Sequence, residues 1–192
     1  MRTLIFATGN KHKADEVQNF LGEGFALLCL KDVGITEDIP ENEPTLEGNA
    51  YQKAKYVFDR TGEACFADDT GLEVEVLNGG PGVHTARYAG DGKSSEDNMA
   101  LLLKNLEGVK NRRARFRTVI AYLDNNGRVF EFEGVVTGVI TEKKSGTEGF
   151  GYDPIFRPDG YDKTFAELPL SEKNKISHRA RAMQKFLEFL NG

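Results

Sequence analysis

Cysteine is scarce in this sequence, and long apolar runs are missing. The two cysteines, Cys29 and Cys65, lie in apolar stretches. Two are too few for a disulfide framework or a zinc site, so we expect buried thiols. No apolar run approaches the ~20 residues of a membrane-spanning helix. The sequence therefore predicts a cytoplasmic protein with no membrane partner.

Cations are also in short supply. The chain carries 25 Lys and Arg against 30 Asp and Glu, for a net charge of -5. Wide contact with nucleic acid needs a basic surface, so we expect no nucleic-acid partner. An acidic protein that binds a polyanion must gather its cations in one place or recruit a metal ion. With 192 residues, 39% of them hydrophobic, the composition is globular, and we expect one domain over residues 1–192.

Apolar periodicity predicts strands that alternate with helices early in the chain, followed by a hairpin. Strands are expected at residues 3–7, 25–30, 64–67, 72–77, 114–123, 128–132 and 135–140. Helices are expected at 14–21, 46–60, 95–107 and 172–190, with Thr45, Ser94 or Ser95, and Ser171 as N-caps. Residues 79–82, Gly-Gly-Pro-Gly, should be loop. This order favours a mixed α/β fold over a purely parallel sheet.

The first candidate site is a strand-to-helix turn. Thr8, Gly9 and Asn10 follow the first strand, and Lys13 falls in the opening turn of the helix. Helix N-termini offer free N–H groups to phosphate, and a lysine adds a point charge. The turn is not a P-loop, because G-x-x-x-x-G-K-[ST] is absent. An ordinary turn with a solvated lysine is the alternative.

Acidic residues form two further groups. Asn49 and Lys53 are four apart, hence on one helix face, and Glu41 precedes them. Asp68 and Asp69 end an apolar strand, where ligands of open α/β sheets gather. Carboxylates beside a lysine suit Mg²⁺ and phosphate. Neighbours on a strand point to opposite faces, so only one aspartate need face the site unless the backbone turns there. Solvated loops and turn caps are the alternatives.

The last groups are a glycine-rich loop and a basic helix start. Residues 145–154 place glycines around Phe150 and Tyr152, which suits amides along a base edge and a ring on its face. Basic side chains open the last helix, including Lys173, His178 and Arg179. Cations there oppose the helix dipole unless an anion binds. Core aromatics and a solvated basic face are the alternatives.

Together these segments resemble the Ham1/ITPase family of purine nucleotide pyrophosphatases over almost the whole chain. The resemblance is carried by the groups above, together with Thr70-Gly71-Leu72, Gly80-Pro81-Gly82, Ala86-Arg87-Tyr88, Phe150-Gly151-Tyr152-Asp153-Pro154 and Ile176-Ser177-His178-Arg179. It implies an α/β fold with a long curved mixed sheet flanked by helices, two lobes with a nucleotide cleft between them, and a homodimer.

The resemblance also implies a Mg²⁺-dependent hydrolysis of unwanted purine nucleoside triphosphates such as ITP, dITP and XTP to monophosphate and pyrophosphate. Asp69 would be the general base, and Glu41, Asp68 and Asp69 the metal partners, with Glu43 an alternative to Glu41. The substrate-binding residues would be Thr8, Gly9, Asn10, Lys13, Lys53, Thr70, Arg87, Phe150, Gly151, Tyr152, Asp153, Lys173, His178 and Arg179.

Three other functions compete with this interpretation. A Maf-like pyrophosphatase would act on pyrimidine or modified nucleotides, and a nucleotide panel would separate the two. A non-catalytic nucleotide sensor would use the same residues, but a pure binder gains little from carboxylates such as Asp68 and Asp69 beside phosphates. A nucleic-acid-binding protein is disfavoured by the acidic balance.

Overall fold

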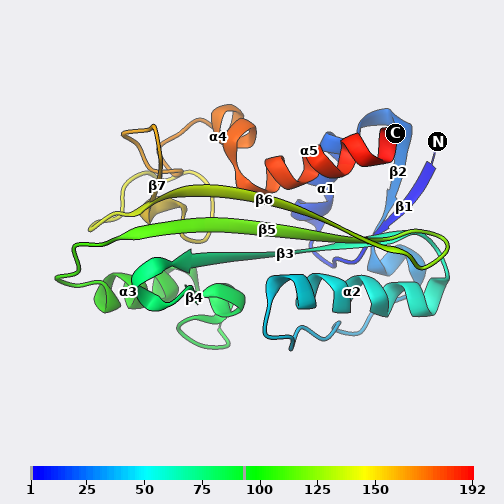
Figure 1. Cartoon of the computed structure of the whole chain (residues 1–192), viewed down its shortest axis with the longest axis horizontal. Helices are drawn as coiled ribbons and strands as arrows, with labels where there is room; N and C mark the ends of the chain where they lie inside the picture. The colour runs from blue at the N-terminus through cyan, green and yellow to red at the C-terminus, as the bar shows by residue number, and fades with distance from the viewer. Residues whose placement is uncertain (1, 93) are drawn as a thin grey trace. The chain divides into compact units, whose positions relative to one another are not determined.

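The computed structural model describes residues 2–92 and 94–192, which fall into two compact units (Figure 1). The first unit comprises Met1–Asp69, Thr118–Glu133 and Ala182–Gly192. The second comprises Thr70–Arg117 and Gly134–Arg181. Among the described residues, no helix combines the length and the apolar character that crossing a membrane requires.

The strands form a mixed sheet in the order β2-β1-β3-β5-β6-β7, with β4 paired to β3. β1 runs parallel to both β2 and β3, whereas β4 and β7 pair antiparallel with β3 and β6. The mixed α/β class predicted from the sequence is confirmed. The strands are β1 Arg2–Phe6, β2 Phe25–Leu28, β3 Cys65–Val74, β4 Gly80–Pro81, β5 Arg113–Leu123, β6 Val129–Ile140 and β7 Phe156–Pro158.

Helix starts follow the expected capping chemistry. Asn10, Thr45 and Ser94 each accept a hydrogen bond from a backbone N–H in the first turn of the following helix. Gly62 ends the second helix in the left-handed conformation that glycine adopts without cost. The helices are α1 Lys11–Leu21, α2 Leu46–Thr61, α3 Ser95–Asn105, α4 Leu170–Ile176 and α5 His178–Asn191.

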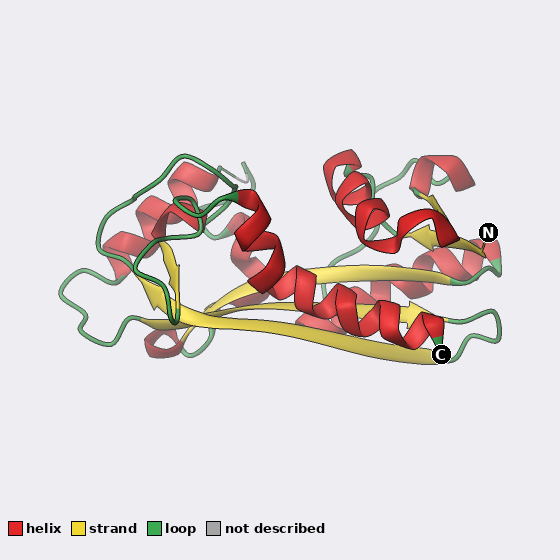
Figure 2. Ribbon diagram, turned by 90° about the horizontal axis from the view of Figure 1, so that it is seen from above, coloured by secondary structure: helices red, strands yellow, loops and turns green. Residues whose placement is uncertain are grey.

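In the first unit, helices cover both faces of the sheet (Figure 2). On one face, Phe66 of β3 stacks on Phe6 and contacts Phe186 of α5. On the other face, the buried thiol of Cys65 donates to the backbone oxygen of Ala54 in α2. Alternation along β3 therefore assigns even-numbered residues to the α1 and α5 side and odd-numbered residues to the α2 side.

The second unit has its own core. Leu72, Leu102, Ile155 and Phe165 are completely buried there, together with residues of β5, β6 and β7. The ring of Phe116 contacts Phe156 edge-on, with centroids 4.7 Å apart. This core anchors the loop at residues 145–154 through Tyr152 and the end of α4 through Ile176.

Several expectations about element boundaries are wrong. β6 is one strand where two were expected, at residues 128–132 and 135–140. β3 continues without a break through Asp68 and Asp69, where two strands were expected. Gly80 and Pro81 pair with β3 instead of forming only loop. The expected last helix is two helices, because Ser177 adopts an extended backbone and its Oγ accepts from the N–H of Ala180. Ser171 is not a cap, since α4 already begins at Leu170.

Candidate functional site

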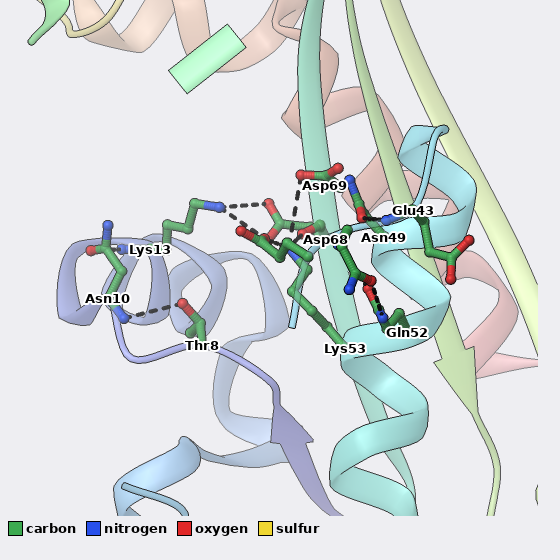
Figure 3. Close-up of polar contacts among 11 residues, drawn as sticks. Thr8, Asn10, Lys13, Glu43, Asn49, Gln52, Lys53, Asp68 and Asp69 are labelled. Atoms are coloured by element: carbon green, nitrogen blue, oxygen red, sulfur yellow. Dashed lines mark hydrogen bonds and ion pairs between the residues drawn. The ribbon is translucent and has the colours of Figure 1, made fainter. Parts of the chain in front are cut away.

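The two aspartates of β3 point to opposite faces of the sheet, because the strand stays extended through them. Asp68 faces α1, where the Lys13 Nζ lies 3.2 Å from its Oδ1. Asp69 faces α2, where the Lys53 Nζ lies 3.8 Å from its Oδ1. The alternation argued from the sequence holds, and each carboxylate has a lysine from a different helix (Figure 3).

Lys53 of α2 connects Glu41, in the loop before that helix, with Asp68 and Asp69 of β3. It is 8% exposed, and its Nζ lies 2.5 Å from Glu41 Oε1. The same ammonium donates to the backbone oxygen of Asp68 at 2.7 Å. Burial disfavours the charged form of Lys53, yet Asp69, Asp68 and Glu41 together raise its pKa above the ordinary value. Lys53 is therefore a fixed positive charge among carboxylates.

Asp69 has the properties of a proton acceptor. Burial raises its pKa to about 6, with Glu41 and Asp68 adding to the shift and with Lys53 and Asn49 opposing it. Its Oδ2 is buried and accepts no hydrogen bond from the described residues. A carboxylate with a pKa near neutrality suits general-base chemistry.

The turn before α1 places polar groups beside Asp68. The Asn10 N–H donates to Thr8 Oγ1 at 3.1 Å, and Asn10 Oδ1 accepts from the Lys13 N–H at 3.2 Å. Gly9 is exposed, with open space where a Cβ would be. The helix N-terminus and Lys13 thus present positive potential next to β3, as an anion site requires.

The carboxylates of this unit fit Mg²⁺ only in part. Glu41 and Asp69 both approach the Lys53 ammonium, so two hard oxygen donors converge on one cationic position. No group of three or more His, Cys, Asp or Glu side chains within residues 2–92 and 94–192 is arranged to hold a metal. Mg²⁺ commonly takes one or two carboxylates and completes its shell with water and substrate phosphates, which this donor set allows.

A second polar cluster lies in the second unit, around Asp153. This carboxylate is 3% exposed and accepts from the Phe150 N–H at 2.9 Å and from the Lys173 ammonium. Lys173 is itself buried, and its Nζ lies 4.6 Å from the centroid of the Phe150 ring. A buried ion pair thereby holds an aromatic loop in place.

The two aromatics of the glycine-rich loop have different environments. Phe150 is 65% exposed, with Lys173 and Arg179 near its ring, so its free face can stack on a base. Tyr152 is 4% exposed and donates its hydroxyl to the Thr85 backbone oxygen. Tyr152 is therefore a core residue, as the alternative interpretation of the loop had it.

His178 and Arg179 open α5 and are both nearly buried, at 7% and 6% exposure. The imidazole of His178 stacks on Phe116, with ring centroids 4.8 Å apart. The Arg179 guanidinium carbon lies 5.9 Å from the Phe150 centroid. Ser177 sets this arrangement, because the break it makes starts a new helix at these two side chains.

The structure groups most of the predicted site residues, but not all. The first unit holds Thr8, Asn10, Lys13, Glu41, Lys53, Asp68 and Asp69. The second unit holds Phe150, Asp153, Lys173 and Arg179. Lys173, which was expected to bind substrate, pairs with Asp153. Glu43 makes its backbone contact with Asn49, so Glu41 is the carboxylate at Lys53. Arg87 is exposed in the 3-10 turn Gly82–Arg87, and Thr70 follows Asp69 in β3.

The chain is similar to known proteins over nearly its whole length. The Ham1 family profile matches residues 4–189. The chain is 54% identical to the dITP/XTP pyrophosphatase of Flavobacterium johnsoniae, over 97% of both chains. It is 49% identical to that of Porphyromonas gingivalis, over 99% of this chain and 98% of the other. A solved structure, the Staphylococcus aureus Ham1 protein, superposes with a TM-score of 0.95 at 36% identity and covers 100% of this chain and 99% of that one. The chain belongs to the Ham1 family.

Proposed function

We propose that this chain hydrolyses ITP, dITP and XTP to the nucleoside monophosphate and pyrophosphate. The observation that carries the proposal is Asp69, a largely buried carboxylate with a pKa of about 6, beside the buried cation Lys53. Relatives at 54% and 49% identity bear the name dITP/XTP pyrophosphatase, which supports this substrate class.

The reaction assigned to the site is attack of water on the α-phosphorus. Asp69 orients the water and takes its proton as the new oxygen–phosphorus bond forms. The bond from the α-phosphorus to the bridging oxygen breaks, and pyrophosphate leaves with that electron pair. Thr8, Asn10, Lys13 and Lys53 neutralise the phosphates, which matters because phosphoryl transfer depends mainly on positioning and charge stabilisation.

Mg²⁺, when bound, would supply further positive charge to the phosphate oxygens. Glu41 and Asp69 are the residues that would hold it, because both converge on the Lys53 ammonium. The side chain of Asp68 faces α1 and pairs with Lys13, so on the α2 face Asp68 offers only its backbone oxygen, which accepts from Lys53.

Base choice is assigned to the second unit. Hypoxanthine and xanthine carry an acceptor oxygen at position 6, where adenine carries a donor amine. His178 and Arg179 are the donors assigned to that oxygen, and Phe150 is the ring assigned to stack on the base. A buried donor left unpaired against adenine would reject ATP, since unsatisfied polar groups are costly.

The proposal is tested with a panel of ITP, XTP, GTP and ATP in the presence of Mg²⁺. We expect pyrophosphate release from ITP and XTP, and far less from ATP. Arg179→Ala should reduce the preference for ITP over ATP by roughly 10- to 100-fold, the usual cost of one specific base contact. Arg181→Ala is the matched control, because Arg181 is exposed and donates to the Val135 backbone oxygen. Equal hydrolysis of ATP and ITP by the wild type would contradict the base assignment.

The proposal extends to a homodimer in the cytoplasm, on the strength of the family membership. Sedimentation equilibrium gives the state directly. A mass of two chains is expected, and a monomer at micromolar concentration would contradict it.

A further inference from the structure

Asn49 is a buried polar side chain whose two ends face different segments. It lies on α2, one turn before Lys53, and only 4% of it is exposed. Its Oδ1 accepts a hydrogen bond of 2.9 Å from the backbone N–H of Glu43. Its amide nitrogen points toward the carboxylate of Asp69 (Figure 3). The side chain of Asn49 thus faces both Glu43, in the loop before α2, and Asp69, the proposed base.

The orientation of this amide is fixed by chemistry. The Glu43 N–H is a donor and requires the amide oxygen, so the NH₂ group must face the other way. A carboxylate such as Asp69 accepts and does not donate when ionised, which makes the NH₂ group its proper neighbour. Asn49 is also among the groups that lower the pKa of Asp69 against the effect of burial.

Loop 41–43 lies along one face of α2 through a series of contacts. Gln52 exchanges two hydrogen bonds with Asn42, at 2.6 and 3.1 Å. Lys53 holds Glu41. At Gly48 the loop comes so close that an added Cβ would lie 2.8 Å from the Cβ of Glu43. Asn49 differs from Gln52, because its side-chain amide points toward Asp69 as well as toward the loop (Figure 3).

We propose that Asn49 is a positioning residue that couples loop 41–43 to the Asp69 carboxylate. Its NH₂ group fixes the rotamer of Asp69, and its oxygen keeps the loop in register on α2. The inference rests on the proposed function, because Asp69 matters only if it acts as the base. It adds a residue to the site that does not itself touch the substrate.

The test separates the two ends of the amide. Asn49→Asp keeps the size of the side chain and an acceptor for Glu43, but it replaces the donor that faces Asp69. Asn49→Ala removes both ends. Each variant is assayed with the triphosphate that the wild type hydrolyses fastest. We expect both to lower kcat by roughly 10- to 100-fold, as loss of outer-sphere partners does, with KM nearly unchanged.

Gln52→Ala is the matched control, since it frees the same loop one turn later without reaching Asp69. It should keep kcat close to the wild-type value. Thermal unfolding of each variant shows whether the fold is intact, and Asn49→Ala carries the test if Asn49→Asp does not fold.

Wild-type kcat in a folded Asn49→Asp or Asn49→Ala variant would overturn the inference. Equal losses in Asn49→Ala and Gln52→Ala would do the same, because they would show that the amide only anchors the loop. An inactive wild type would instead refute the proposed function itself, so the two failures are distinguishable.

Discussion

The Nζ atom of Lys53 lies 3.8 Å from Oδ1 of Asp69, and both side chains are largely buried. In this pair the lysine keeps its charge because several carboxylates surround it, whereas burial pushes the carboxyl of Asp69 toward its protonated form. A base held near neutrality beside a permanent cation is the relationship on which the proposed chemistry depends.

Asp69→Asn should abolish most turnover and leave the fold intact. The amide has the shape of the carboxylate but cannot take a proton, and general-base catalysis contributes about 10²- to 10⁴-fold. Steady-state kinetics with ITP and a thermal melt measure both effects. Asp59→Asn is the control, because Asp59 pairs with Lys55 on the surface and should leave kcat unchanged. Undiminished kcat in Asp69→Asn would remove Asp69 from the role of base.

The pH profile of kcat/KM should show an acidic limb. Asp69 must be ionised to accept a proton, and its pKa in the metal-free protein is about 6. Activity should therefore fall as the pH drops below this value and level off above it. A bound cation would move the limb to lower pH, never to higher pH. A limb centred near pH 8 would show that another group controls the reaction.

The free energy of unfolding of the metal-free protein should also depend on the ionisation of Asp69, and the direction of this pH dependence follows from the raised pKa. A carboxyl whose pKa rises from 3.8 to about 6 on folding binds its proton more tightly in the folded state. Its contribution to the free energy of unfolding is thus lost as pH rises through this window, by about 3 kcal/mol. Urea unfolding in EDTA should show Asp69→Asn gaining on the wild type between about pH 4 and pH 7. A pH-independent difference between the two would contradict the shifted pKa.

Breaking the buried pair of the second unit should destabilise the protein. Asp153→Ala leaves the ammonium of Lys173 buried without its carboxylate, which typically costs about 3–5 kcal/mol. The double variant Asp153→Asn with Lys173→Met removes both charges and should recover much of this loss. Urea unfolding at neutral pH gives both values. A single variant as stable as the wild type would mean that the pair does not organise the loop.

Alanine substitutions at two glycines of the loop at residues 145–154 distinguish the effect of a steric clash from that of backbone strain. Gly149 and Gly151 both have positive φ, at 79° and 61°. A Cβ at Gly149 would lie 2.2 Å from Asp153 Oδ2, whereas one at Gly151 would meet nothing within 4 Å. Both alanine variants pay about 1–2 kcal/mol of strain. Gly149→Ala should lose clearly more stability in urea unfolding, and it should also weaken ITP selectivity, because it displaces Asp153. Equal losses in the two variants would contradict this.

The sequence predicted the class of fold and most capped helix starts, because these follow from local chemistry. Thr45 and Ser94 cap helices as predicted, whereas the cap at Asn10 was not predicted. The continuation of β3 through Asp68 and Asp69 was not predictable locally, because polar residues near glycine favour a turn. Lysines from two helices give these carboxylates partners and let the strand run on.

The site was predicted less completely. Alternation on β3 gave the opposite directions of the two aspartates, but it could not show which helix each would meet. Nothing in the pattern of the glycine-rich loop distinguishes Phe150, which stays exposed, from Tyr152, which joins the core. Ser177 had a local signal, since serine is a favoured N-cap, but a continuous apolar periodicity concealed the break.

Hydrolysis of ITP in ¹⁸O-labelled water tests the central claim most directly. With wild-type protein and Mg²⁺, mass spectrometry should find one labelled oxygen in the monophosphate and none in pyrophosphate, because water attacks the α-phosphorus. Label in pyrophosphate, or release of inorganic phosphate with a nucleoside diphosphate, would place the attack elsewhere and contradict the account.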